Sequence, residues 1–96
     1  MKNLDILFVA RLEYANAVDW YLKKSVSAAN RFSAEVENAI EAIHESPEQW
    51  ARWDDTYRFY LLNKFPYFVA YRQTKDTVVV VAIRHAARDQ DEWLGR

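Results

Sequence analysis

The stretch VVVVAI at residues 78–83 decides the fold class, because it contains no polar side chain. A strand with one solvated face alternates apolar and polar residues, whereas an unbroken apolar run of this length is typical of a strand that is covered on both faces. We therefore predict a strand over residues 77–83 that lies inside a sheet. Helices are expected on one face of that sheet, and something else on the other.

Two strand-like segments precede this one. Residues 57–63 and 67–72 are rich in aromatic and β-branched side chains, which favour strands. Pro66 lies in the link between them, where its missing N–H does no harm, and residues 74–76 form the loop before the apolar run. The three segments predict an antiparallel meander.

The first half of the chain predicts one strand and two helices. Residues 4–9 are short, apolar and β-rich, and an amphipathic helix is expected over about 10–24. Ser27 is the predicted N-cap of a second helix, which should stop at Ser46 because Pro47 cannot continue it. The predicted apolar stripes are Leu12, Ala15, Val18 and Leu22 in the first helix, and Ala29, Phe32, Val36, Ala39, Ile40 and Ile43 in the second. The predicted fold class is α+β: an N-terminal strand, an antiparallel two-helix hairpin and a three-stranded antiparallel meander, with the helices packed on one face of a small, mostly antiparallel sheet.

Composition bounds the remaining possibilities. The 96 residues are expected to form a single domain over 1–96, with a short C-terminal tail at about 86–96. Cysteine is absent and only two histidines are present, so we expect no disulfide, no metal and no cofactor. Gly95 is the single glycine, which excludes Gly-rich phosphate loops. No apolar run approaches the roughly 20 residues that span a bilayer, and the N-terminus lacks the features of a signal peptide, so a cytoplasmic protein with no membrane contact is predicted.

The net charge of −1 is unevenly distributed. Residues 1–49 carry five Lys and Arg against eight Asp and Glu, and residues 50–96 carry eight against six. A half with a net charge of +2 falls well short of the basic face that non-specific nucleic-acid binding uses. Any contact with nucleic acid would have to be local.

The segment IRHAARDQDEW at residues 83–93 holds the candidates for chemistry. His85 is a possible general base, or it ends the last strand with one nitrogen hydrogen-bonded to backbone or to a carboxylate such as Asp89. Arg84 and Arg88 are able to bind phosphate, or to form ion pairs with the acidic residues of the tail. Trp93 would stack on a base, dock the tail on the domain, or contact a protein.

Four tryptophans and six tyrosines are more than one small core easily hides. Partly exposed aromatic side chains together with arginines are the composition of a protein-binding face. The candidate partner-binding residues are Trp20, Tyr21, Arg58, Arg72, Arg84, Arg88 and Trp93.

The order of these segments resembles that of the RelE/ParE superfamily, the toxins of bacterial type II toxin–antitoxin systems. The residues that carry the resemblance are 17–21 (AVDWY), 28–32 (AANRF), 46–47 (SP), 65–67 (FPY), 71–72 (YR) and 83–85 (IRH), with Arg88 and Trp93. The resemblance implies a small α+β fold, a cognate antitoxin that wraps part of the toxin in a hetero-oligomer, and a target that depends on the branch. The ParE-like branch binds and inhibits DNA gyrase, whereas the RelE-like branch is an mRNA interferase, an endoribonuclease that works on the ribosome.

Departures from the interferase pattern favour the ParE-like branch. Phe68 stands where interferases carry a basic residue, and Asp54 and Asp55 would repel a phosphate. The favoured hypothesis is therefore a toxin without a catalytic centre that binds gyrase. The alternatives are an interferase with the site Arg72, Arg84, His85 and Arg88, whose partners are ribosome and mRNA, and a non-toxic member that only binds its antitoxin.

Overall fold

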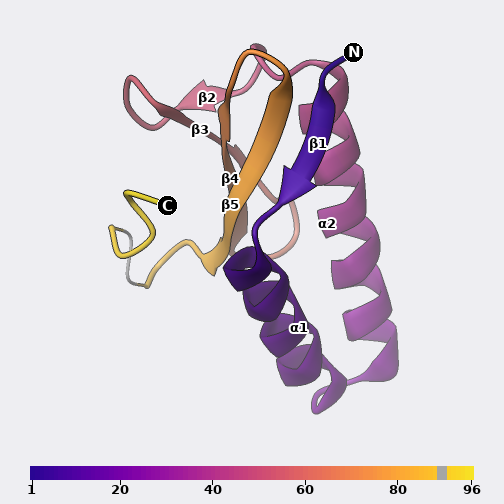
Figure 1. Ribbon diagram of the computed structural model, residues 1–96. Coiled ribbons are helices and arrows are strands. Elements are labelled where there is room, and N and C mark those ends of the chain that lie inside the picture. The colour runs from indigo at the N-terminus through magenta and orange to yellow at the C-terminus, as the bar shows by residue number, and fades with distance from the viewer. Residues whose placement is uncertain (89–90) are drawn as a thin grey trace.

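The computed structural model describes residues 1–88 and 91–96, and within them two helices cover one face of a five-stranded sheet (Figure 1). The elements follow the order β1 (Asn3–Ile6), α1 (Phe8–Leu22), α2 (Val26–Glu45), β2 (Ala51–Arg52), β3 (Tyr57–Leu61), β4 (Tyr67–Gln73) and β5 (Thr77–His85). The strand order in the sheet is β1-β5-β4-β3-β2, in which β1 runs parallel to β5 and every other pair is antiparallel. The predicted α+β class and the antiparallel meander are confirmed.

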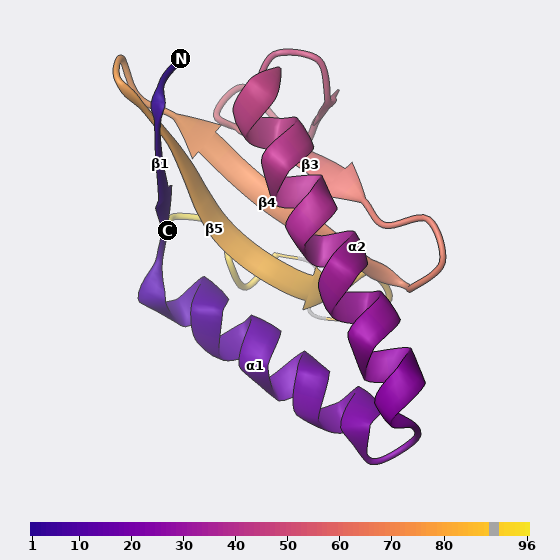
Figure 2. The same ribbon diagram turned by 90° about the vertical axis from the view of Figure 1, so that its right-hand side faces the viewer.

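The central position of β5 follows from its apolar sequence. Val78 and Val80 belong to the hydrophobic cluster under the helices, whereas Val79 and Val81 belong to a second cluster on the opposite face. That opposite face is covered by the C-terminal tail, whose Trp93 is completely buried. Figures 1 and 2 show the helices and the tail on opposite sides of the sheet. Both covers that the apolar run requires are therefore present.

The boundary between β1 and α1 differs from the prediction. Residues 4–9 were expected to form a strand, but β1 ends at Ile6 and α1 starts at Phe8. Ile6 is the last β1 residue in register with β5, opposite Val80, and the Leu7 N–H still donates to the Val80 carbonyl at 3.0 Å. The chain enters the helix as soon as the ladder ends, so strand and helix follow one another without a loop.

Three of the four residues in the predicted inner stripe of α1, Leu12, Ala15 and Leu22, are exposed, and only Val18 lies on the inner face. Leu12 and Leu22 are 47% and 46% exposed, and the buried residues are instead Ala10 and Ala17. Tyr14, Val18 and Tyr21 complete the inner face. Small alanines let the helix approach β5 closely, and the tyrosine rings fill the space beside them. Because α1 carries apolar side chains on both faces, periodicity could not tell which face is buried.

The second helix follows its predicted stripe but begins earlier than expected. Its buried residues are Ala29, Phe32, Val36, Ala39 and Ile43, with Ile40 partly buried. The N-cap is Ser25, whose Oγ accepts from the Ala28 N–H at 3.1 Å, whereas Ser27 lies in the first turn and accepts from Arg31. The helix ends at Ser46 before Pro47, as predicted. Among the described residues, neither helix is long and apolar enough to cross a membrane.

The connection from α2 to β3 contains the short strand β2, which was not predicted. Ala51 pairs with Phe59, and Arg52 pairs with Arg58. An alternation of apolar and polar side chains cannot be recognised in two residues, so only the pairing with β3 defines this strand.

Candidate functional site

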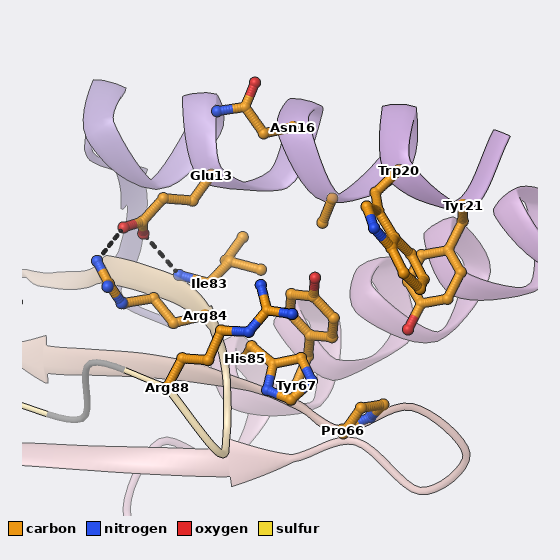
Figure 3. A pocket seen from close by; sticks show the side chains of 11 residues that line it. Glu13, Asn16, Trp20, Tyr21, Pro66, Tyr67, Ile83, Arg84, His85 and Arg88 are labelled. Carbon is orange, nitrogen blue, oxygen red and sulfur yellow. Dashed lines mark hydrogen bonds and ion pairs between the residues drawn. The ribbon is translucent and has the colours of Figure 1, made fainter. Parts of the chain in front are cut away.

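A pocket of about 420 Å³ opens between α1 and the ends of β4 and β5 (Figure 3). Its lining residues are Glu13, Asn16, Ala17, Trp20 and Tyr21 from α1, Pro66 and Tyr67 from the start of β4, and Ile83, Arg84, His85 and Arg88 from β5 and the tail. The pocket therefore brings together four of the predicted partner-binding residues, Trp20, Tyr21, Arg84 and Arg88, with His85.

The β5 wall of this pocket depends on a β-bulge. The register between β4 and β5 shifts in mid-strand, so that Val81 has no residue of its own opposite it. Val81 and Ala82 consequently both face the tail side. The alternation then resumes, which turns Ile83 and His85 toward the helices. Without the extra residue these two side chains would point to the opposite face of the sheet.

His85 ends β5, which runs two residues beyond its predicted end at Ile83, and its ring is held by two neighbours. The Ala87 N–H donates to Nδ1 of His85 at 3.1 Å, so a neutral imidazole carries its proton on Nε2. The ring also meets the ring of Tyr67 edge to face, with 5.3 Å between the centroids. Asp89, the other partner considered for His85, lies outside the described residues.

Aromatic side chains of α1 form the opposite wall. Trp20 is 49% exposed, and its ring has the edge of Tyr21 on one side and the Lys24 ammonium 5.0 Å from its centroid. Tyr21 packs deeper, against Phe32 and Phe65. Trp20 thus presents a large, half-exposed apolar surface to the pocket and rests against Tyr21, which is itself packed on Phe32 and Phe65.

The tyrosine and arginine side chains of the pocket influence one another. Burial raises the pKa of Tyr67, and the positive charge of Arg88 opposes that rise. Burial likewise raises the pKa of Tyr21. Both phenols are therefore neutral hydrogen-bonding groups at physiological pH, and Arg88 supplies positive charge at an exposed position.

Arg84 is engaged in an ion-pair network in which Glu13 is the central group. Its guanidinium lies 2.9 Å from the Glu13 carboxylate and 3.2 Å from Glu92. Arg96 donates to the same Glu13 carboxylate at 3.0 Å and to the Val81 carbonyl at 3.1 Å. The ion-pair alternative for Arg84 is thus the arrangement observed, but its main partner, Glu13, was not foreseen.

Glu13 was missed because no local pattern indicates its role. Helical spacing places it off the predicted stripe, where a charged residue is normally a solvated one. Its partners lie about 70 to 83 positions later in the chain, so only the fold brings them together.

The remaining predicted site residues lie elsewhere. Arg72 faces the tail side of β4, where its Nε donates to the backbone oxygen of Arg96 at 3.0 Å. Arg58 donates to the Trp50 carbonyl at 2.7 Å. Both border a separate polar pocket of about 210 Å³ with Arg52. Arg72 and His85 are therefore on opposite faces of the sheet, and about 17 Å of strand separates their pairing positions on β4.

Trp93 is buried in the cluster under the tail. Its ring meets Trp53 and Tyr57 with centroid distances of 4.9 and 5.1 Å. The Gly95 N–H donates to the Tyr57 hydroxyl at 3.0 Å, which fastens the same segment. Of the three roles predicted for Trp93, docking of the tail on the domain is the one observed. A partner could touch Trp93 only after the tail moved away.

Two of three comparisons with known proteins found a match. The family model described as the ParE toxin of type II toxin–antitoxin system, parDE, matches residues 10–90. A solved structure described as the chromosomal ParDE TA system from P. aeruginosa aligns with a TM-score of 0.66 at 14% sequence identity, over 88% of this chain and 96% of that one. At this identity the structural likeness concerns the fold. Curated protein sequences gave no match.

Proposed function

The chain belongs to the family of ParE toxins of type II toxin–antitoxin systems, and from that membership we propose that it acts by binding and inhibiting DNA gyrase. An antitoxin is the partner that neutralises it, as in every system of this type. Gyrase is the target that the family resemblance implies, and it would place the toxin's action in the cytoplasm. Under this proposal the chain has no catalytic centre.

The engagement of two of the four candidate interferase residues elsewhere in the fold supports this proposal. RNA cleavage by attack of the 2′-hydroxyl needs a base, an acid and positive charge around one phosphate. Of the four residues that an interferase would use, Arg72 is on the far face of the sheet and Arg84 is paired with Glu13 and Glu92. That leaves His85 and Arg88, one possible base and one cation, of the set that an interferase would use.

The pocket beside α1 is the surface we propose for recognition of the antitoxin. Its exposed tryptophan, neutral tyrosines and positively charged Arg88 suit a partner segment with an apolar or aromatic side chain next to an acidic one. Such a segment would bury Trp20 and place its carboxylate near Arg88. Large aromatic side chains of this kind commonly dominate the free energy of binding.

Two assays run side by side test the target. The purified toxin should inhibit supercoiling by gyrase or trap gyrase in its cleaved complex with DNA, and mRNA should remain intact on translating ribosomes. His85→Ala should inhibit gyrase as the unmodified chain does. Codon-dependent mRNA cleavage that disappears in His85→Ala would overturn the proposal in favour of an interferase. Activity in neither assay, with tight antitoxin binding retained, would indicate a member that only binds its antitoxin.

A further inference from the structure

His85 offers the pocket beside α1 a hydrogen-bond donor that the fold itself does not use. Its Nδ1 is occupied, because it accepts the Ala87 N–H at 3.1 Å. In the neutral ring the proton is therefore on Nε2, the nitrogen farther from the backbone. In the part of the chain that the structure describes, no group accepts a hydrogen bond from this Nε2. The edge-to-face contact with Tyr67 holds the ring in place beside the pocket.

Arg88 lies next to His85 because the two residues are the ends of one turn. The Arg88 N–H donates to the His85 carbonyl at 3.2 Å, so the chain turns back within four residues. The Ala86 N–H donates to the Pro66 carbonyl at 2.7 Å, which fastens the turn to the start of β4. Figure 3 shows the Arg88 side chain alongside the rings of His85 and Tyr67. The turn thus presents a charged donor and a neutral donor side by side.

The positive charge of Arg88 is not balanced within the pocket. Glu13 is the one acidic residue among the described residues that line it, and its carboxylate is shared by Arg84 and Arg96. No carboxylate of the described residues lies within ion-pair distance of Arg88, which is exposed. The pocket therefore suits a ligand that brings one negative charge.

A carboxylate fits this pair of donors. Its two oxygens can accept one hydrogen bond from the imidazole and a second, charge-assisted one from the guanidinium. A phosphate monoester carries about two negative charges near neutral pH, and it would be repelled by Glu13 in the same pocket. The rings of Trp20 and Tyr21 on the α1 side offer an apolar surface for the methylene carbons of an acidic side chain.

We propose that His85 and Arg88 together bind one aspartate or glutamate side chain of the antitoxin, His85 through its Nε2–H and Arg88 through its guanidinium. This rests on the proposed recognition of the antitoxin by the same pocket, and it adds the atoms that read the partner. The role of His85 is to hold a donor in position and not to transfer a proton. Such a site distinguishes an acid from its amide, because the amide has no charge for Arg88 and turns an N–H toward a donor.

Calorimetric titration of the full chain with the product of the neighbouring antitoxin gene tests the shared carboxylate. Arg88→Ala and His85→Ala should each weaken the affinity about tenfold or more. The double variant should weaken it by much less than the product of the two factors, because a carboxylate that has lost one donor is no longer held against the other. His85→Gln keeps a side-chain N–H donor and should recover most of the loss in His85→Ala, which a purely structural role of the ring would not allow.

Acid-to-amide substitutions in the antitoxin, made one at a time, identify the ligand. One Asp→Asn or Glu→Gln change should weaken binding as much as Arg88→Ala does, and Arg88→Ala should cause little further loss with that antitoxin variant. Lys75→Ala removes a positive charge from the exposed loop between β4 and β5, and as the control it should leave the affinity unchanged.

The results distinguish this carboxylate site from the pocket as a whole. If Trp20→Ala weakens antitoxin binding whereas Arg88→Ala and His85→Ala do not, the pocket binds the antitoxin and the carboxylate site is overturned. If all three variants bind normally, recognition of the antitoxin by the pocket fails as well. Factors that simply multiply in the double variant, or the lack of any acid-to-amide change that matches Arg88→Ala, also overturn the site. Lost gyrase inhibition with unchanged antitoxin binding would assign the carboxylate to gyrase instead.

Discussion

The carboxylate of Glu13 on α1 accepts the backbone N–H of Ile83 on β5 at 3.1 Å. Ile83 lies beyond Val80, the last β5 residue in register with β1, so its N–H has no strand beside it on that edge. Arg96 meets the neighbouring Val81 carbonyl and pairs with Glu13 at the same time. The side chains of Glu13 and Arg96 thus make hydrogen bonds to the β5 backbone beyond the point where β1 ends. Edges left open in this way invite pairing with other chains, so this arrangement also guards against aggregation.

Replacing Glu13 should therefore destabilise the chain far more than a surface carboxylate would. Glu13→Ala removes the acceptor of a buried N–H and leaves the guanidinium groups of Arg84 and Arg96 without their shared partner. We expect the free energy of unfolding to fall by about 2 to 3 kcal/mol in urea titrations. Glu41→Ala, an exposed substitution on α2, is the matched control and should change it by less than about 0.5 kcal/mol. Equal effects in both variants would show that the edge closure contributes little.

Removing the Trp93 ring should release the tail from the sheet. Trp93→Ala deletes a fully buried indole that contacts Trp53 and Tyr57, and we expect a loss of about 3 to 5 kcal/mol in the free energy of unfolding. Amide hydrogen exchange of residues on the tail side of β4 and β5 should accelerate. Leu94→Ala, at the neighbouring position that is 37% exposed, serves as the control. If exchange in the two strands stays slow in Trp93→Ala, the tail is not their essential cover.

Shortening Trp20 should weaken partner binding without weakening the fold. Its ring is half exposed, so Trp20→Ala should cost less than about 1 kcal/mol of stability. A buried aromatic anchor is worth about 2 kcal/mol or more in a complex, which corresponds to a roughly 30-fold weaker affinity for the antitoxin by calorimetry. Leu61→Ala, an exposed apolar residue at the end of β3, should bind normally. Unchanged affinity in Trp20→Ala would remove the pocket from the antitoxin interface.

The stability of the chain should fall in strongly alkaline solution. Burial raises the pKa of Tyr71 to about 12 from 10.0, an effect that the nearby Arg58 partly opposes. Between these two values the unfolded chain has lost the phenol proton and the folded chain has kept it. The contribution of Tyr71 is therefore complete below pH 10 and is lost as the pH rises toward about 12.

Tyr71→Phe should flatten this part of the profile of unfolding free energy against pH. The variant also loses the hydrogen bond from the Tyr71 hydroxyl to the Pro47 carbonyl at 2.6 Å, so it should be less stable at neutral pH. Some alkaline loss should remain, because burial raises the pKa of Tyr14, Tyr21 and Tyr67 as well. A profile as steep as that of the unmodified chain would show that Tyr71 is not responsible.

The apolar run in β5 and the stripe of α2 were sufficient to predict the class of the fold. The run in β5 has no polar face and the stripe of α2 has a helical period, so each is compatible with only one kind of burial. The inner face of α1 could not be predicted in the same way, because Leu12 and Ala17 lie on different sides of the helix and both belong to apolar patterns. The spacing of apolar residues shows that a helix is apolar on two sides, but it does not show which side packs on the sheet.

The sequence by itself determined the order of the two helices and of the strands other than β2, the place of β5 inside the sheet and the need for a cover on each face of the sheet. Tertiary structure alone decided which charged residues meet. The bulge at Val81 sets which face His85 occupies, and the fold separates Arg72 from it while joining Glu13 to Arg84 and Arg96. The physical reason is range: periodicity and caps act over a few residues, whereas a site is made by side chains that the packing of whole elements brings within a few ångströms of one another.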